Sequence, residues 1–474
     1  MAKTREYDFV VIGGGAAGLV AAATSTGMGA KTLLVEKSDR LGGECAWTGC
    51  IPSKTLIHIA SVAREAREHG CPYAVEEISE NAMRECRRMT SEIAERSRSH
   101  EKLLEMGTEV VLNGNITFTG KNELELDGAK IRAEKAIICT GSSPHMPDIP
   151  GIHDVDCLTN LNVFELERPP KSMTIIGAGP IGIEFAQAFH ELGTKVTVLQ
   201  KNDCILDKDD RELTEMLKNI LVRRGIDIKL NADVERIEKS GSLIRTYFSC
   251  ENKGCYTETE TLLCGVGRYA NIDGLCLENI GLDPDHKGLA TNKFRRTKSD
   301  WVFTAGDVDG SYQFSHSAEY EAVIAVNNAL STVFEATDYK WMPWATFSHP
   351  ELAHLGPTEK ELIDSGVKYK AFRKEFSGND RALTDGDGVG LVKLLSSHDG
   401  KLLGAHILGP RAGELMNELV LGAKKGIKLS ELALAVHIYP TLNIALQRAA
   451  DNWFVELDEK PWKKNSVQLF TRHI

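Results

Sequence analysis

The sequence predicts an α/β protein with two Rossmann-like dinucleotide-binding domains and a C-terminal α+β domain. Two glycine-rich turns, at residues 13–18 and 177–182, each lie between a run of strand-forming residues and an apolar helix. After about residue 344 the pattern changes to short strands followed by long helices, without such turns. A chain of 474 residues is long enough for about three domains.

The first glycine-rich turn has the full arrangement of a dinucleotide-binding unit. Residues 7–12 are typical of a buried parallel strand, and Gly-Gly-Gly-Ala-Ala-Gly at 13–18 leads into an apolar helix. A second strand at 31–36 ends in Glu36, about 20 residues further on. The glycines allow close approach to a pyrophosphate, the helix N-terminus supplies amide donors, and Glu36 can bind a ribose 2′-hydroxyl. This unit is therefore predicted to bind a dinucleotide.

Residues 174–199 repeat this arrangement with one difference. A strand at 174–176 runs into Gly-Ala-Gly-Pro-Ile-Gly at 177–182, and a helix at 183–189 and a strand at 195–199 follow. The second strand is followed by Gln200 and Lys201, so no carboxylate awaits a free 2′-hydroxyl and a cation can approach a 2′-phosphate. Two units imply two dinucleotides, or one dinucleotide and a relic. The second unit is predicted to favour NADPH over NADH.

Two cysteines, Cys45 and Cys50, follow the first turn in the run Gly-Gly-Glu-Cys-Ala-Trp-Thr-Gly-Cys-Ile-Pro-Ser-Lys at 42–54. If the segment is helical, they flank one turn, where they either close a small disulfide loop or present two thiols to one side. A thiol pair beside a bound nucleotide indicates that electrons pass from the cofactor to sulfur. The pair is therefore predicted to be catalytic rather than a structural cross-link.

Composition and charge exclude several other classes of protein. The net charge of −11 argues against nucleic acid as a partner, because phosphate binding needs a basic face. The chain has neither a secretory signal nor a long uninterrupted apolar run, so no membrane span is expected. Eleven irregularly spaced cysteines indicate a cytoplasmic protein with one redox-active pair. Cys250 and Cys255 flank a turn, where they are either linked across a hairpin or two separate thiols; no zinc site is expected there.

Between and beyond the two units, the sequence predicts further elements. Gly306-Asp307 ends a strand at 301–308, where the aspartate can hold a ribityl or ribose hydroxyl. Residues 55–107 are predicted to be mostly helical and charge-rich. The other expected strands are 110–118, 123–126, 136–139, 371–376, 389–395 and 401–408, and the late helices are 413–424, 429–435 and 441–453.

On these residues the chain resembles the flavin-dependent pyridine-nucleotide disulfide oxidoreductases, the family of glutathione reductase, dihydrolipoamide dehydrogenase and mercuric reductase. The resemblance covers nearly the whole chain, and its most specific part is Cys45–Cys50 with Pro-Ser-Lys at 52–54. Gly-Arg-Tyr-Ala-Asn at 267–271 is similar to the family's G-R-x-P-N, and 347–351 resembles the start of its dimerisation domain. The implied domains are an FAD-binding domain (1–155), an NAD(P)-binding domain (156–272), a return segment of the FAD domain (273–343) and a dimerisation domain (344–474).

The resemblance also implies residue roles. Cys50 would lie against the flavin as the charge-transfer thiolate, and Cys45 would be the exposed interchange thiol that attacks substrate. Lys54 and Glu184 would pair beside flavin N5 and the nicotinamide. A cation there stabilises reduced flavin, and positive surroundings lower the pKa of a thiol. The chain would be a homodimer with active sites shared across the interface.

The same resemblance implies two sets of cofactor-binding residues. For FAD they are Gly13, Gly15, Ala17, Gly18, Glu36, Lys37, Gly43, Lys54, Thr140, Gly141, Ser142, Asp307 and Ala318. For NADPH or NADH they are Gly177, Gly179, Pro180, Ile181, Gly182, Glu184, Gln200, Lys201 and Gly267.

The chain departs from the family near its C-terminus. Disulfide-reducing members carry a His-Pro motif and a later Glu as an acid–base dyad, whereas this sequence has Tyr439 and Ile444 at those positions. Loss of such a group typically costs on the order of 10²–10⁴ in rate. Two residues before Tyr439, His437 is a candidate replacement, and Tyr439 either touches a ligand or packs at an interface. Mercuric reductases resemble this chain in having Tyr there, but they carry a C-terminal Cys pair, and here the last cysteine is Cys276.

The sequence therefore predicts an enzyme that passes electrons from NAD(P)H through FAD to Cys45–Cys50 and on to an acceptor that needs no proton donor. That acceptor is a soft metal ion such as Hg²⁺, which the two cysteines would bind, or a quinone or dye, or an unusual disulfide or persulfide. The first alternative is a dihydrolipoamide dehydrogenase-like disulfide reductase in which His437 or Tyr439 partly replaces the dyad. The second is a flavin-holding binding or assembly subunit.

Overall fold

The computed structural model describes residues 4–250, 253–285 and 288–457. The outermost parts of the predicted first and last domains, 1–3 and 458–474, lie outside the described residues. The chain forms two compact units, one of residues 1–170 with 261–338 and one of residues 171–260 with 339–474. Residues 156–170 and 261–272 group with the first unit, whereas the sequence assigned them to an NAD(P)-binding domain. That four-segment division stays a prediction.

The first unit is built on a seven-stranded sheet of order β3-β2-β1-β6-β5-β4, with β17 paired to β6. The pairs among β1, β2, β3, β6 and β17 are parallel, and β4, β5 and β6 form an antiparallel meander. The strand expected at 110–118 is two strands, because the chain turns at Asn113 with a φ of 53°. The strands are β1 (Arg5–Ile12), β2 (Thr32–Val35), β3 (Glu109–Val111), β4 (Ile116–Gly120), β5 (Glu123–Leu126), β6 (Ala129–Ile138) and β17 (Val302–Thr304).

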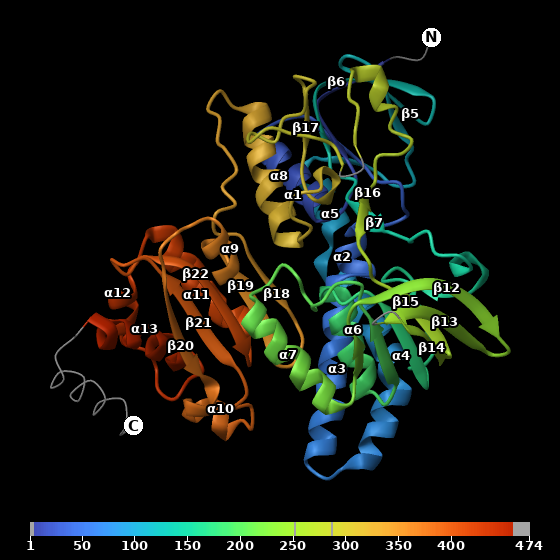
Figure 1. Ribbon diagram of the computed structural model, residues 1–474. Helices are drawn as coiled ribbons and strands as arrows, with labels where there is room; N and C mark the ends of the chain where they lie inside the picture. The colour runs from blue at the N-terminus through green and yellow to red at the C-terminus, as the bar shows by residue number, and fades with distance from the viewer. Residues whose placement is uncertain (1–3, 251–252, 286–287, 458–474) are drawn as a thin grey trace. The chain divides into compact units, whose positions relative to one another are not determined.

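The central strand β1 is buried on both faces, as expected for a parallel strand covered by helices. Val10 and Ile12 belong to the core on one face of the sheet. Phe9 and Val11 belong to the core on the other face, where α1 (Ala16–Gly27) and α8 (Ser315–Leu330) pack together (Figure 1). The buried faces of these helices are rich in alanine, which lets them pack closely on each other and on the sheet.

The stretch expected to be helical at 55–107 consists of three helices. They are α3 (Cys50–Glu68), α4 (Pro72–Ser97) and α5 (Ser99–Met106), and α3 and α4 pack against each other as a hairpin. Just before them lies the short helix α2 (Gly43–Trp47). No helix among the described residues is both long enough and apolar enough to cross a membrane.

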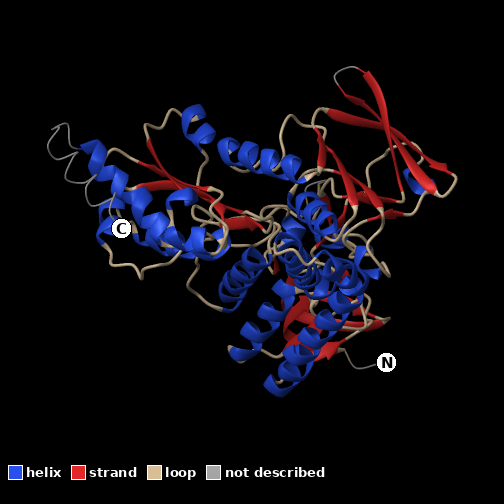
Figure 2. Ribbon diagram, turned by 90° about the horizontal axis from the view of Figure 1, so that it is seen from below, coloured by secondary structure: helices blue, strands red, loops and turns tan. Residues whose placement is uncertain are grey.

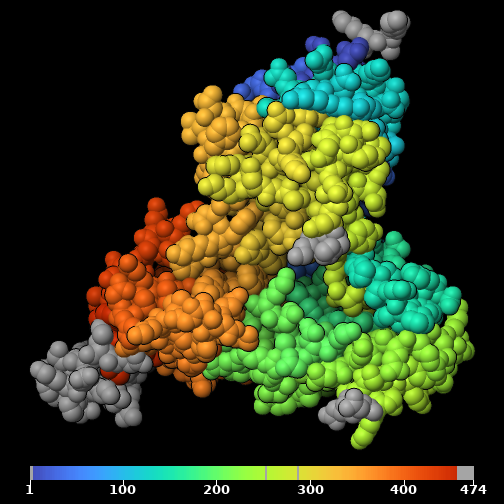
Figure 3. Space-filling view, turned by 45° about the horizontal axis from the view of Figure 1, so that its top comes forward, coloured from blue at the N-terminus to red at the C-terminus, as the bar shows by residue number. Residues whose placement is uncertain are grey.

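Residues 261–338 complete the first unit. In Figure 3 this segment, in yellow and light orange, forms a continuous surface with the cyan part of the N-terminal segment. The short elements of the unit are β7 (Ser142–Pro144), η1 (Ile152–Asp154), β8 (Cys157–Leu158), η2 (Val163–Glu165), β15 (Thr261–Cys264), β16 (Arg268–Ala270), η3 (Leu277–Ile280) and η4 (Asp307–Asp309). β8 pairs in parallel with β15, and β7 pairs with β16 in antiparallel.

The second unit begins with the other β-α-β arrangement. β10 pairs in parallel with β9 and with β11, and a three-stranded antiparallel sheet of order β12-β13-β14 follows (Figure 1). The elements are β9 (Ser172–Ile176), α6 (Pro180–Glu191), β10 (Lys195–Leu199), α7 (Arg211–Arg224), β11 (Asp227–Lys229), β12 (Ala232–Ser240), β13 (Leu243–Cys250) and β14 (Lys253–Thr259).

The rest of the second unit is an antiparallel sheet of order β18-β19-β22-β21-β20 with helices packed on it (Figure 2). This matches the expected α+β pattern, except that the last helix begins at Ile444 rather than at 441, because Thr441 caps a turn by donating to the Ile438 carbonyl. The elements are β18 (Pro343–Thr346), β19 (Glu351–Leu355), α9 (Glu359–Asp364), β20 (Lys370–Glu375), η5 (Phe376–Gly378), α10 (Asp380–Thr384), β21 (Leu391–Ser396), β22 (Leu402–Gly409), α11 (Ala412–Lys425), α12 (Leu429–Leu434) and α13 (Ile444–Leu457).

Candidate active site

The first glycine turn leaves open space at the start of α1. A Cβ added to Gly18 would lie 1.8 Å from the Gly13 oxygen, so only glycine permits the helix to pack this closely on the strand. In contrast, a Cβ on Gly15 would meet nothing closer than the Cα of Gly43, at 3.9 Å. No side chain caps the N-terminus of α1. An uncapped helix N-terminus beside open space fits the pyrophosphate of a dinucleotide.

The acid expected to bind a ribose is fixed in place by this turn. Oε2 of Glu36 accepts a hydrogen bond of 2.6 Å from the Gly14 amide, and Oε1 accepts one of 2.8 Å from the Ser38 amide. Glu36 is buried at the end of β2, and the next residue, Lys37, is exposed. The carboxylate is therefore held beside the turn, as a ribose contact requires.

The redox motif packs directly against the same turn. Gly43 has a φ of 57°, and a Cβ there would lie 2.8 Å from the Cα of Gly15. Cys45 lies in α2, and Cys50 is the first residue of α3. The two cysteines therefore do not flank one turn of a single helix, as expected for a continuous helical segment, because Thr48 and Gly49 separate two helices.

The two thiols hydrogen-bond to each other. They do not form a disulfide in this structure, and the hydrogen bond with Cys50, followed by burial, raises the pKa of Cys45. Cys50 Sγ lies 3.4 Å from Ser315 Oγ. Cys50 begins α3, and the dipole of a helix N-terminus favours a negative charge on a thiol there.

The two thiols differ in exposure. Cys50 is exposed and Cys45 is half-buried. The difference arises because Cys45 lies inside the short helix α2, while Cys50 stands at the open start of α3. The assignment of Cys50 to the flavin and Cys45 to the substrate stays a prediction.

A chain of hydrogen bonds joins the redox motif to the expected flavin contacts. Arg268 Nη2 donates to Oε2 of Glu44 at 2.6 Å, and Arg268 Nε donates to Ser142 Oγ at 2.7 Å. Ser142 Oγ in turn donates to Oδ2 of Asp307 at 2.5 Å. Burial raises the pKa of Asp307, which the hydrogen bond from Ser142 and the charge of Arg268 oppose. Sequence reasoning gave no role to Glu44 or Arg268, although it noted the Gly-Arg motif.

The loops around Thr140 and Asn271 are tied together. Thr140 Oγ1 donates to the Asn271 carbonyl at 2.5 Å, and the Asn271 amide donates to the Gly141 carbonyl at 2.9 Å. A Cβ on Gly306 would lie 3.2 Å from Ala318 Cβ and 3.5 Å from Ala17 Cβ. The first unit thus brings the predicted residues of α1, β7, η4 and α8 to one place.

A buried ionic network supports Gly306 from behind. Oε2 of Glu321 accepts a hydrogen bond of 2.8 Å from the Gly306 amide. Arg295 lies 3.1 Å from that carboxylate and 2.5 Å from Oδ2 of Asp309, and all three side chains are at most 5% exposed. Sequence reasoning gave no role to Arg295, Asp309 or Glu321.

The second glycine turn repeats the first with an amide in place of the carboxylate. A Cβ on Gly182 would lie 2.1 Å from the Gly177 oxygen, whereas one on Gly179 would meet nothing within 4 Å. Oε1 of Gln200 accepts a hydrogen bond of 3.0 Å from the Ala178 amide, as Glu36 does from Gly14. The remaining predicted contacts are Pro180 and Ile181 in the first turn of α6, Lys201, which is paired with Asp233 at 3.1 Å, and Gly267, which lies in the first unit.

Glu184 is buried on α6. Its Oε1 accepts a hydrogen bond of 2.9 Å from the Phe347 amide, and the residue is 7% exposed. Lys54 lies on α3 of the first unit. The pairing of Lys54 with Glu184 stays a prediction.

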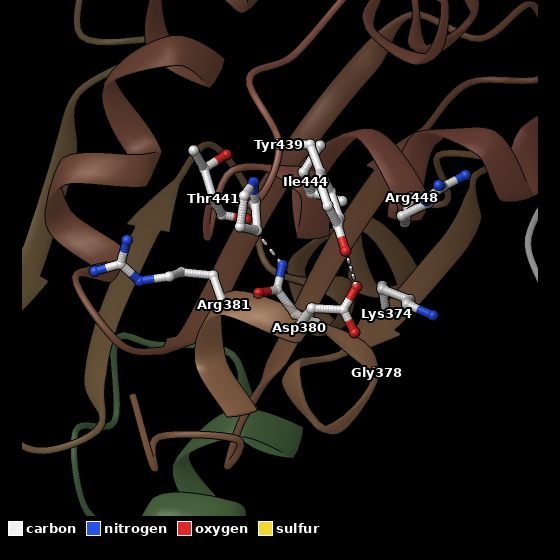
Figure 4. Close-up of a pocket in the computed structure, with 10 residues that line it drawn as sticks. Lys374, Gly378, Asp380, Arg381, Tyr439, Thr441, Ile444 and Arg448 are labelled. Atoms are coloured by element: carbon white, nitrogen blue, oxygen red, sulfur yellow. Dashed lines mark hydrogen bonds between the residues drawn. The ribbon is translucent and has the colours of Figure 1, made fainter. Parts of the chain in front are cut away.

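The residues at the family's acid–base positions make contacts within this chain. The hydroxyl of Tyr439 donates to Oδ2 of Asp380 at 2.9 Å, and that hydrogen bond raises the pKa of the phenol. Figure 4 shows Tyr439 and Ile444 lining a small pocket beside Asp380. The other residues that line it include Lys374, Arg381, Thr441 and Arg448.

His437 makes contacts within the chain two residues before Tyr439. Its Nε2 lies 3.1 Å from Oε1 of Glu418, its Nδ1 lies 2.9 Å from the Ala435 carbonyl, and its side chain is 6% exposed. Asn443 donates to the other carboxylate oxygen of Glu418. Both ring nitrogens thus face acceptors within the chain.

The other cysteine pair, Cys250 and Cys255, lies in the hairpin of β13 and β14. Cys255 lies opposite Phe248 and Cys250 opposite Lys253, and both thiols are free, so the two are not linked. Among the described residues, no group of three or more His, Cys, Asp and Glu side chains is placed to hold a metal ion.

Two uncapped glycine turns, one of them packed against a thiol pair, define a redox enzyme that uses two dinucleotides. The chain belongs to the pyridine nucleotide-disulphide oxidoreductases, because that family's model matches residues 7–322 and its dimerisation domain matches residues 342–450. The expected family and fold class are therefore confirmed. The chain is an FAD-dependent NAD(P)H oxidoreductase with a redox-active disulfide.

Its relatives fall into more than one branch of the family. A mercuric reductase of Lysinibacillus sphaericus is 31% identical over 412 residues, which cover 86% of this chain and 75% of that protein. A dihydrolipoyl dehydrogenase of Bacillus subtilis is 32% identical over 466 residues, which cover 94% of this chain and 97% of that protein. The Cu(II) complex of the HOCl-induced flavoprotein disulfide reductase RclA from Escherichia coli has a TM-score of 0.84 at 27% identity, covering 95% and 100% of the two chains.

Proposed function

We propose that this enzyme passes electrons from NAD(P)H to Cys45–Cys50 and from there to a soft or borderline metal ion, with Hg²⁺ and Cu²⁺ as the leading candidates. The observation that carries this proposal is the contact between Tyr439 and Asp380. Where disulfide-reducing relatives need a positioned acid, this chain has a phenol that already donates to its own carboxylate. At the second position of the dyad, where those relatives carry Glu, this chain has Ile444, which can orient no acid. A metal ion takes up electrons without a proton, so the missing group costs such a reaction nothing.

The chain's own residues fit this task. Thiolates are the ligands that soft metal ions prefer, and Cys45 and Cys50 are close enough to hydrogen-bond. Both sulfurs bind a metal ion as thiolates, so an arriving cation displaces any proton that they carry. Ser315 lies against Cys50 and orients that sulfur. When bound, FAD supplies hydride acceptance from the nicotinamide and two-electron transfer to sulfur.

The relatives support a metal ion as the acceptor. One curated relative is a mercuric reductase, and one solved neighbour was obtained as a Cu(II) complex. The chain lacks a C-terminal Cys pair, since its last cysteine is Cys276, so the ion would reach Cys45 directly or as a small thiol complex.

An acceptor screen tests the proposal. Purified, FAD-loaded protein is mixed with NADPH or NADH and with Hg²⁺ or Cu²⁺ as thiol complexes, quinones, glutathione disulfide or lipoamide. The expected result is metal-dependent NAD(P)H oxidation with a kcat/KM about 10² or more above that for the disulfides, the lower bound for a lost acid–base group. Efficient turnover of any disulfide together with none of the metals would overturn it.

The second candidate is disulfide reduction with a rebuilt acid–base site. It is favoured by the hydrogen bond between His437 and Glu418, which pairs a histidine with an orienting carboxylate. The almost complete burial of the His437 ring opposes it, because a proton donor must reach the departing sulfur. If His437→Gln abolishes disulfide turnover and spares metal turnover, the second function is also present.

We further propose that the enzyme is a homodimer formed through residues 342–450. Support comes from large apolar side chains that are more than half exposed in this region, which include Leu421, Leu434, Val436, Ile438 and Tyr439. A monomer seldom leaves such a cluster in water. Sedimentation of the FAD-loaded protein should give twice the chain mass, and a monomer at micromolar concentration would contradict the proposal.

A further inference from the structure

The first unit holds a second pair of cysteines that neighbour each other in space. Cys157 lies in β8 and Cys264 ends β15, and these two strands pair in parallel with Cys157 opposite Leu262. Because side chains alternate along a strand, Cys264 points to the same face as Leu262 and therefore as Cys157. The two thiols hydrogen-bond to each other. The sequence alone does not reveal this pair, since residues 157 and 264 are far apart along the chain.

The two thiols of this pair differ in access and in acidity. Cys264 is 2% exposed, whereas Cys157 is half-buried, and both are free. Their mutual hydrogen bond raises the pKa of Cys157 and lowers the pKa of Cys264. The buried thiol is therefore the more acidic of the two.

Both cysteines stand just before side chains that hold the redox motif. Three residues after Cys157, Asn160 Nδ2 donates to Oε2 of Glu44 at 3.0 Å and to the Thr48 carbonyl at 3.3 Å. Four residues after Cys264, Arg268 Nη2 donates to the same Oε2 of Glu44 at 2.6 Å. Glu44 is the neighbour of Cys45 in α2, and Thr48 lies between the two catalytic cysteines. The strands β8 and β15 thus lead to the two side chains that clamp Glu44.

We propose that Cys157 and Cys264 are a second redox pair, which oxidises to a disulfide and thereby fixes the clamp of Asn160 and Arg268 on Glu44. Formation of the bond draws β8 and β15 together and changes how tightly α2 is held, so the reactivity of Cys45 depends on the state of the second pair. The inference concerns the chain's own thiols and holds for any electron acceptor.

The oxidation is a thiol–disulfide exchange with a small disulfide R–S–S–R. Cys157 loses its proton to solvent and attacks one sulfur, which forms a mixed disulfide and releases one RS⁻. Cys264 then loses its proton, attacks Cys157 Sγ and releases the second RS⁻. In total the two cysteines lose two electrons and two protons, and R–S–S–R with these two protons becomes two thiols. The lowered pKa of Cys264 favours the second attack, because that thiol loses its proton more readily.

The first test asks whether the cross-link forms. The FAD-loaded Cys45→Ser/Cys50→Ser protein, which cannot form the other disulfide, is treated with 5,5′-dithiobis(2-nitrobenzoate), alkylated and mapped by peptide mass spectrometry. The expected product joins the peptides of Cys157 and Cys264 and is lighter than their sum by two hydrogen atoms. A stable reagent adduct on Cys157, or two unmodified peptides, would overturn the proposal.

The second test asks whether the cross-link reaches Cys45. Wild-type holoenzyme is oxidised in the same way, freed of reagent and reduced anaerobically with NADPH, and the rate at which iodoacetamide alkylates Cys45 is measured. Cys157→Ser treated identically should differ from wild type by about threefold or more, the scale of a modest change in thiolate population. Cys276→Ser, which removes another half-buried thiol of the first unit, should match wild type. Equal rates in all three proteins would overturn the link between the second pair and the active site.

Discussion

The hydroxyl of Tyr439 donates a hydrogen bond of 2.9 Å to Oδ2 of Asp380, a residue of α10. In disulfide-reducing relatives this position of the turn carries the histidine of an acid–base dyad. Here the turn is tied to its own subunit twice, through Tyr439 to Asp380 and through His437 to Glu418. Because both side chains are already engaged within the chain, we expect an acceptor that takes electrons without a proton.

The missing dyad can be restored. Tyr439→His with Ile444→Glu should raise the kcat/KM for lipoamide or glutathione disulfide by about 10²-fold, because a positioned acid is worth on the order of 10²–10⁴ in rate. Steady-state NADPH oxidation measures the change. Tyr439→His alone should gain less, because its imidazole lacks an orienting carboxylate. If the double variant shows no gain while it retains FAD and the dimer, absence of the dyad does not limit disulfide turnover.

The nicotinamide nucleotide preference should respond to Gln200. Gln200→Glu places a carboxylate beside the Ala178 amide, in the position of the second glycine turn that is equivalent to Glu36 in the first. A carboxylate binds a ribose 2′-hydroxyl and repels a 2′-phosphate. The ratio of kcat/KM for NADPH to that for NADH should fall by about tenfold or more, since a hydrogen bond to a charged group is worth about 1.5–3 kcal/mol.

Substitution of Lys201 tests whether its ammonium contributes to the binding of the NADPH 2′-phosphate. Its ammonium is exposed and lies 3.1 Å from Asp233. Lys201→Gln should weaken NADPH and leave NADH unchanged. An enzyme that already prefers NADH, and whose ratio neither substitution moves, would contradict the predicted preference.

Glu321 should be required to hold the loop of Gly306 and Asp307. Glu321→Gln keeps the shape of the side chain but removes one of the two carboxylates that pair with Arg295, the other being Asp309. Breaking a buried ion pair costs about 3–5 kcal/mol. The free energy of unfolding of the apoprotein, measured with urea, should fall, and so should the fraction of FAD retained after gel filtration. Glu101→Gln, on the exposed face of α5, should change neither.

Asp209 should make the stability of the second unit depend on pH. Its Oδ1 accepts a hydrogen bond of 3.0 Å from Trp344 Nε1, and burial raises its pKa to about 7. Between the unfolded value of about 4 and this value, the folded chain binds more protons than the unfolded chain. The stabilising contribution is therefore complete below about pH 4 and is lost as the pH rises through about 7.

Substitution of this residue isolates the effect. Asp209→Asn keeps the acceptor for Trp344 but cannot ionise. The free energy of unfolding of this variant relative to wild type should therefore rise between about pH 5 and about pH 8, with a slope of at most about 1.4 kcal/mol per pH unit. Urea unfolding at both pH values measures it. Asp203→Asn, an exposed residue paired with Arg211, should show no such trend. A constant difference between Asp209→Asn and wild type would refute the assignment.

The sequence predicted the parts of the fold that local patterns determine. Both β-α-β units, the helices after Cys50 and the late strands follow from apolar periodicity and glycine positions, and they lie where expected. The break at Asn113 and the late start of α13 were missed, because a single left-handed residue or a capped turn leaves no periodic signal. The glycine turns were predictable for a physical reason: Gly18 and Gly182 allow no side chain at all.

Relations between distant residues could not be predicted. Glu44, Asn160 and Arg268 come from three segments, and only the folded chain shows that they meet. The same holds for Arg295 with Glu321 and for Cys157 with Cys264. Cys45 and Cys50 were identified because their spacing is local, but their exposure depends on the helices α2 and α3, whose separation the motif does not reveal.

Electron transfer through Cys45–Cys50 to a metal ion is tested most directly by measuring metal-dependent NADPH oxidation. The FAD-loaded wild type, Cys45→Ser and Cys50→Ser are compared, with Hg²⁺ or Cu²⁺ supplied as a thiol complex. We expect steady turnover in the wild type and its loss in both variants, while each variant still binds FAD and NADPH. Cys157→Ser, which leaves the first pair intact, should retain turnover. Metal-dependent oxidation at the wild-type rate in Cys45→Ser would show that the electrons bypass the pair and would contradict the central claim.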